Sequence, residues 1–129
     1  MRSQMVWAAA VAMEWRFEPG KGFDMPGPDT AWARRRIPLV AGEEDTPLTR
    51  ALTLADSSWA VAFALDHQQR LVINTDVTLA LHREPLGEWF CIRSATAASP
   101  RGSGLALGQL DDKVGDCGRI LQTLLVADR

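Results

Sequence analysis

Hydrophobic and polar residues change their spacing along this chain, from a helical period in one stretch to alternation in several others. In residues 46–63 the apolar positions recur at about 100° per residue and form one stripe, which consists of Leu48, Ala51, Leu52, Ala55, Trp59 and Ala62. Asp45 and Thr46 are both suitable N-cap residues, and Pro47 fits the first helical position. We therefore predict one main helix from Thr46 to about Leu65.

Alternating and extended segments predict strands on both sides of this helix. Residues 71–82 alternate most clearly, with apolar side chains at most odd positions. Further segments lie at residues 11–18, 32–40, 88–96, 105–110 and 118–126, and turns rich in Gly and Pro separate most of them. Arg34, Arg35 and Arg36 are expected to be solvated or to guard a sheet edge, with a phosphate contact as the alternative. One helix followed by an antiparallel meander predicts an α+β fold.

Composition narrows the class of protein to a single globular domain over residues 1–129, with 47% hydrophobic and 23% charged residues. A net charge of −2 argues against nucleic acid as a partner. Cys91 and Cys117 lack zinc-ligand spacing, so we expect no metal, while two free thiols and a lone disulfide both stay open. No nucleotide-cofactor motif occurs.

The short apolar run at residues 5–13 is not followed by a cleavage site, and no segment approaches the length of a membrane span. These two features predict a cytoplasmic protein.

Asp56 is the residue whose position needs a chemical explanation. It lies at the border of the apolar helical stripe, roughly 70° from its middle. We therefore expect it to be half-buried. A half-buried carboxylate needs either a hydrogen-bonding partner or a functional role.

Several short segments of this chain resemble the C-terminal half of acyl-CoA thioesterase II-like proteins, in the same order and at approximately the same spacing. The segments are Pro-Leu-Val at 38–40, Thr-Pro-Leu at 46–48, Leu-Ala-Asp at 54–56, Ile-Asn-Thr-Asp at 73–76, Leu-His-Arg at 81–83, Gly-Glu-Trp at 87–89 and Arg-Ile-Leu-Gln at 119–122. The resemblance covers residues 13–129. It implies a hot-dog fold, in which an antiparallel sheet wraps around one long helix. It also implies hydrolysis of a fatty acyl-CoA or a related acyl thioester, without a cofactor.

In that family an aspartate, a threonine and a glutamine bind and activate the attacking water. The resemblance places the aspartate on Asp56 and the glutamine on Gln122, and it places the threonine on Asn74. Strand alternation favours the neighbouring Thr75, which it assigns to the apolar, helix-facing side. A local β-bulge would reconcile the two assignments. A carboxylate can accept a proton from water, and amide or hydroxyl groups can orient that water. His82 is interpreted as a hydrogen-bonded packing residue and not as a base.

The same resemblance suggests a substrate trough and an assembly. Trp59 and Phe63 would line an apolar trough for the acyl chain. Because the family's N-terminal hot-dog half is missing from this sequence, two copies would have to supply it, which predicts a homodimer or a dimer-based oligomer.

Two alternative functions stay open. The chain could be a non-catalytic module that binds an acyl group or only dimerises, because Ser58 and Trp59 replace small residues of the family. A hot-dog dehydratase would need an Asp/His pair, and His67 lies eleven residues after Asp56.

Overall fold

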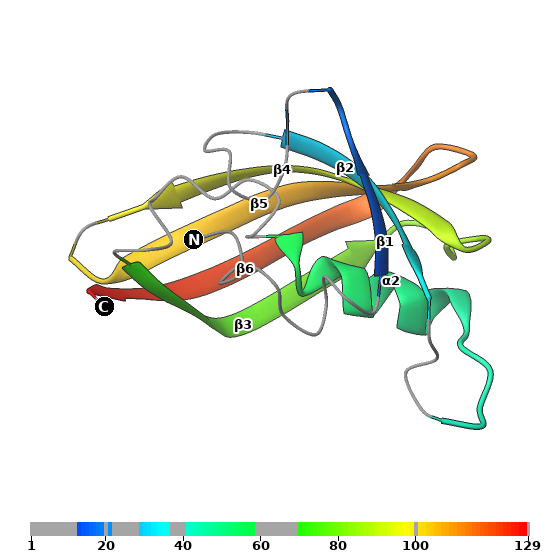
Figure 1. Cartoon of the computed structure of the whole chain (residues 1–129), viewed down its shortest axis with the longest axis horizontal. Coiled ribbons are helices and arrows are strands. Elements are labelled where there is room, and N and C mark those ends of the chain that lie inside the picture. Colours follow the sequence, from blue (N-terminus) through cyan, green and yellow to red (C-terminus); the bar gives the residue numbers. More distant parts are fainter. Residues whose placement is uncertain are drawn as a thin grey trace.

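A six-stranded sheet and the helix α2 form the regular structure of the described part of the chain (Figure 1). The computed structural model describes residues 13–19, 21, 29–36, 41–58, 70–99 and 101–128. In chain order the elements are β1 (Met13–Phe17), β2 (Asp29–Arg35), α2 (Pro47–Ala55), β3 (Arg70–Leu81), β4 (Trp89–Ala98), β5 (Ser103–Asp112) and β6 (Asp116–Asp128). The predicted α+β class is confirmed.

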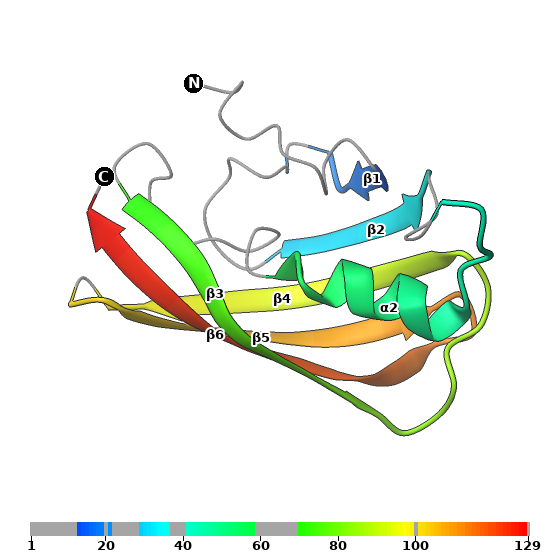
Figure 2. The same cartoon turned by 90° about the horizontal axis from the view of Figure 1, so that it is seen from below.

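The strands are all antiparallel to their neighbours and follow the order β1-β2-β4-β5-β6-β3. Short turns connect β4, β5 and β6, whereas β3 crosses over to pair with β6. Helix α2 contacts β2 and β4, which lie toward one end of this order, and β3, which lies at the other end. The sheet therefore curves around the helix, and Figure 2 shows α2 lying along one face of it.

The start of α2 follows the predicted capping pattern. The Thr46 hydroxyl accepts the backbone N–H of Thr49 at 3.1 Å, and the Thr49 hydroxyl accepts the backbone N–H of Thr46 at 2.8 Å. Each bond satisfies a donor that the first helical turn leaves open. Pro47 occupies the first position of the helix, where no hydrogen-bond donor is needed. Of the two candidate caps, Thr46 therefore fills the role.

Asp45 instead pairs with an arginine of the second strand. Its carboxylate lies 3.1 Å from Arg35 Nε, and both side chains are buried. The prediction that this arginine would be solvated is therefore wrong, because it joins the end of β2 to the entrance of α2. The strand itself starts earlier and ends earlier than the predicted segment 32–40. Residues 37–40 lie outside the described residues.

Small residues let the helix approach the sheet closely. Ala51, Leu54 and Ala55 are fully buried on α2. They belong to a core cluster with side chains of β1, β2, β4, β5 and β6, which are Met13, Ala33, Phe90, Ile92, Leu110, Cys117 and Ile120. Removing this apolar surface from water is the main driving force for the packing.

The face of the helix that was predicted to be buried needs correction. Leu48 and Leu52 belong to the predicted core stripe, yet they are 47% and 44% exposed. The helix buries Leu54 in their place. The element α2 ends at Ala55, with Asp56 as C-cap, and most of the rest of the predicted helix cannot be compared with the structure. Residues 59–69 lie outside the described residues. No helix among the residues that the structure describes is long and apolar enough to span a membrane.

An ion pair with a buried carboxylate fixes one end of the sheet. Arg83 donates from both terminal nitrogens to the Asp112 carboxylate, at 2.6 and 2.7 Å. The same carboxylate accepts the backbone N–H groups of Leu86, Val114 and Gly115. The Arg83 guanidinium and these amides hold the pKa of the Asp112 carboxyl well below its usual range. The pair thereby joins the loop before β4 to the turn between β5 and β6.

Candidate active site

Asp56 caps the C-terminal end of α2 and is the centre of the candidate site. Its backbone keeps a right-handed helical conformation, with φ −62° and ψ −21°, and its N–H donates back to Leu52 O at 3.3 Å. The carbonyl and the carboxylate of Asp56 therefore project beyond the last helical turn. The side chain is exposed in the single chain, so the expectation of a half-buried carboxylate is wrong for this chain on its own.

Gln122 approaches Asp56 from the sheet. Alternate residues of β6 face the helix, and Gln122 is one of them, with no exposed surface. Its Nε2 donates to the Asp56 carbonyl oxygen at 2.9 Å. A fully buried amide is costly unless it is hydrogen-bonded, so this contact explains why an apolar strand tolerates a glutamine.

Asn74 approaches the same residue from β3. Its Nδ2 donates to Asp56 Oδ1 at 2.9 Å and to the Asp56 carbonyl oxygen at 3.2 Å. Its Oδ1 is shielded from solvent and has no hydrogen-bond partner among the residues that the structure describes. The structure therefore brings together Asp56, Asn74 and Gln122, which lie far apart in the sequence.

Thr75 lies on the opposite face of the sheet from these three residues. The β3–β6 register shifts between Asn74 and Asp76, which marks a β-bulge at Thr75. The Thr75 hydroxyl bonds the hydroxyl of Thr123 at 2.8 Å, on the side of the sheet that faces away from α2. The prediction that Thr75 shares the helix-facing side is therefore wrong, and the extra residue of the bulge is the reason.

The structure does not describe three other predicted residues, and it places a fourth away from this cluster. Trp59, Phe63 and His67 lie outside the described residues. His82 is exposed and lies 3.4 Å from Asp116 Oδ1, so it is not the packing residue that we expected. Arg119 and, to a lesser extent, His82 lower the pKa of the Asp116 carboxyl.

The oxygens of the cluster define what it can bind. Both amide groups donate to Asp56, which leaves its exposed carboxylate as an acceptor for a further molecule. A carboxylate suits a molecule that donates hydrogen bonds, as water does. Across the described ranges, no three His, Cys, Asp or Glu side chains are placed to hold a metal ion.

A buried hydroxyl pair fixes the segment that follows Asp56, and sequence reasoning missed it. Ser58 Oγ and Ser94 Oγ lie 3.0 Å apart, between the end of α2 and β4. A Cβ at Gly108 would come within 3.0 Å of Ser58 Oγ, so the strand leaves room for this pair. A glycine inside the β5 segment was the signal for such a close approach.

This arrangement of one helix on a curved antiparallel sheet occurs in known thioesterases. The chain matches the family model described as acyl-CoA thioesterase C-terminal domain over residues 2–126, and it belongs to that family. No curated protein matches it. The predicted hot-dog fold and the predicted family are confirmed.

Solved structures of thioesterases share the fold at low sequence identity. A thioesterase family protein from Silicibacter pomeroyi is 16% identical with a TM-score of 0.64, over 94% of this chain and 88% of that one. The acyl-CoA thioesterase II TesB2 from Mycobacterium marinum is 19% identical with a TM-score of 0.62, and the match covers 92% of this chain but only 50% of that one. A hypothetical thioesterase from Streptococcus pneumoniae, solved with coenzyme A, is 13% identical with a TM-score of 0.62, over 90% and 88% of the two chains.

Proposed function

We propose that this chain hydrolyses acyl thioesters, with fatty acyl-CoA as the substrate class, and that Asp56 activates the attacking water. The observation that carries the proposal is the pair of side-chain amides, from Asn74 on β3 and Gln122 on β6, that both hold Asp56. The Gln122 amide also serves as a cap for the helix end, but a purely structural aspartate would not need the Asn74 amide on its carboxylate. Family membership supports the reaction type, and the neighbour solved with coenzyme A supports the substrate class.

The chemistry follows from the acceptors at the site. The Asp56 carboxylate takes one proton from a water molecule while the water oxygen attacks the thioester carbonyl carbon. Asn74 holds the carboxylate through its Nδ2 and thereby fixes the direction in which the carboxylate accepts from the water. When the tetrahedral intermediate collapses, the carbon–sulfur bond breaks and the proton on Asp56 passes to the departing thiolate. The products are a carboxylic acid and a free thiol, and no cofactor is consumed. Trp59 and Phe63 are our proposed contacts for the acyl chain.

We also propose that the working form is a homodimer. Leu48, Leu52 and Asp56 are spaced by four residues, so they follow one line along the exposed surface of α2. A second copy packed on this line would bury the two leucines and exclude water from the surroundings of Asp56. The 12-residue strand β3 is an edge of the sheet and offers backbone groups for side-by-side pairing. Light scattering should report a dimer or a multiple of it, and a monomer at micromolar concentration would refute the assembly.

The test is hydrolysis of a panel of acyl-CoA thioesters by purified protein, followed through the released thiol. The Asp56→Asn variant keeps the shape and the contact with Asn74, but it loses the proton acceptor, so turnover should fall about 10²–10⁴-fold. Asp76→Asn is the matched control. Asp76 is an exposed carboxylate on β3, the strand that carries Asn74, and its replacement should change turnover little. Binding of acyl-CoA without hydrolysis would favour the acyl-binding module. A cytoplasmic location for the activity stays a prediction.

A further inference from the structure

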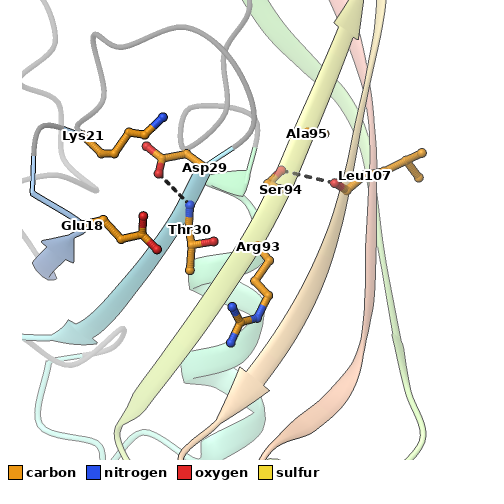
Figure 3. Close-up of a pocket in the computed structure, with 8 residues that line it drawn as sticks. All are labelled: Glu18, Lys21, Asp29, Thr30, Arg93, Ser94, Ala95 and Leu107. Carbon is orange, nitrogen blue, oxygen red and sulfur yellow. Dashed lines mark hydrogen bonds between the residues drawn. The ribbon is translucent and has the colours of Figure 1, made fainter.

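The side of the sheet turned away from α2, which we call the outer face, is apolar along β3, β5 and β6. Across β6 and β3, Leu125 pairs with Ile73, and the neighbouring β5 contributes Leu107. Figure 3 shows the Leu107 side chain projecting from β5 on the side away from the helix. Six large apolar side chains of the outer face are 36–55% exposed, and they are Leu71, Ile73, Leu105, Leu107, Leu121 and Leu125. A solvated face of an antiparallel sheet normally carries polar residues, so the outer face has the composition of an interface.

A hollow and a set of projecting side chains lie at different ends of the outer face. The hollow has a volume of about 550 Å³, is lined mainly by apolar residues and is bordered by Arg93 and Arg119. Leu105 and Leu125 project at the other end, where β5 begins and β6 ends. A second copy turned end for end would place these two leucines over the hollow of the first, and would receive those of the first in its own. The outer face is therefore complementary to itself under a two-fold rotation.

Charge and area both favour a second copy as the partner. Arg119 borders the hollow, whereas the exposed Asp76 lies beside the projecting leucines, because it pairs with Thr123 across β3 and β6. The same rotation brings Arg119 of one copy toward Asp76 of the other, which favours this register. The four strands from β4 to β3, about 4.8 Å apart, and eight residues at about 3.3 Å each give a flat area of about 500 Å² per copy. Two copies thus cover about 1,000 Å², which is enough for a specific interface.

We propose that a second copy of this chain packs on the outer face, sheet against sheet, about a two-fold axis. Burial of the exposed leucines supplies the driving force. The contact lies on the opposite side of the sheet from α2, so it is separate from the dimer proposed above for the α2 surface and the edge of β3. Both contacts can form at once, and the chain then assembles as a dimer of dimers. The proposal does not depend on thioester hydrolysis.

The experiment is light scattering on the purified full chain at micromolar concentration, where no other protein can occupy the outer face. We expect the mass of four copies for the natural chain. A variant that combines Leu107→Glu and Leu121→Glu should have half this mass, because two charges would be buried in an apolar contact. Val114→Glu is the matched control. Val114 is 76% exposed in the turn between β5 and β6, outside the outer face, so its replacement should leave the mass unchanged.

Two further measurements separate this contact from the proposed activity and from the dimer at α2. The combined variant should release thiol from acyl-CoA at the natural rate per chain, to within about twofold, because both leucines point away from Asp56. Leu48→Glu should remove the contact at α2 and leave a dimer held by the outer face.

The masses of these variants decide the proposal. A natural dimer that the combined variant dissociates would support this contact and refute the one at α2. An unchanged mass in the combined variant, or a natural chain that is a monomer, would overturn the proposal whether or not thioesters are hydrolysed. Circular dichroism checks that the combined variant folds. If it does not fold, Leu107→Glu alone replaces it, because Leu107 is the most exposed of the six side chains.

Discussion

Replacing Asn74 by alanine should slow thioester hydrolysis by about 10- to 150-fold. The variant removes the amide that donates to the Asp56 carboxylate at 2.9 Å. A hydrogen bond to a charged group contributes about 1.5–3 kcal/mol. Each 1.36 kcal/mol corresponds to a factor of about ten in rate, which gives the stated range if the bond acts fully in the transition state. The loss should fall on kcat more than on KM, because Asn74 orients the carboxylate and not the substrate.

The neighbouring residue provides the matched control for this prediction. Thr75→Val keeps the size of the side chain and removes a hydroxyl that bonds Thr123 on the opposite face of the sheet, so hydrolysis should change by no more than about twofold. Asn74→Thr, which restores the residue type that the family resemblance implies, should retain more activity than Asn74→Ala. The assay is thiol release from acyl-CoA under single-turnover and steady-state conditions. A larger loss in the Thr75 variant than in the Asn74 variant would refute the bulge-based assignment.

Three further predictions concern the scaffold. Asp112→Asn should lower the free energy of unfolding by about 2–4 kcal/mol in urea denaturation, because this carboxylate is 1% exposed and accepts from Arg83 and three amides. Asp116→Asn, at a half-exposed ion pair, should cost clearly less, and equal costs would contradict the reasoning. Because the folded-state pKa of Asp112 is depressed, its contribution to stability is complete above about pH 4 and is lost as pH falls further. The unmodified protein and the Asp112→Asn variant should therefore converge in stability in acid. Burial raises the pKa of the Cys91 thiol to about 11, so a thiol reagent at pH 8 should modify it only after unfolding, and rapid labelling of the native protein would contradict this.

Much of the fold was predictable because local signals and packing agree. Thr46 and Pro47 specify where α2 begins, and the alternating segments correctly indicate where most of the strands lie. Leu48 and Leu52 were assigned to the core because a helical period does not say which apolar side meets the sheet. The sheet is packed against the smaller residues Ala51 and Ala55, which allow a closer approach. An apolar side chain that stays exposed in the single chain gives the same sequence signal as one that is buried in the core.

The candidate site was predictable only in part, and the β-bulge is the physical reason. In a regular strand an odd–even pattern keeps every odd residue on one face, so Ile73, Thr75 and Val77 would all face the helix. The extra residue at the bulge reverses the faces after Asn74, so that Val77 pairs with Gln122 on the helix side while Ile73 pairs with Leu125 on the other. Alternation read from residues beyond the bulge was extended through it, and this placed Thr75 on the wrong face. Alignment of short segments does not depend on periodicity, so it selected Asn74, whose amide contacts the Asp56 carboxylate.

Asn74 distinguishes a catalytic site from a helix cap more sharply than Gln122 does. The carbonyl of Asp56 lies at the end of α2, where the last carbonyl groups of a helix lack intrahelical partners. The Gln122 amide satisfies that carbonyl, so its contact has a structural explanation whether or not the protein is an enzyme. The contact from Asn74 to the Asp56 carboxylate has no such explanation, because an exposed carboxylate is solvated without help. Orienting this carboxylate makes sense if the direction of its lone pairs matters, as it does for a general base. Loss of stability in a Gln122 variant would therefore not separate the two roles, whereas loss of turnover at unchanged stability in the Asn74 variant would.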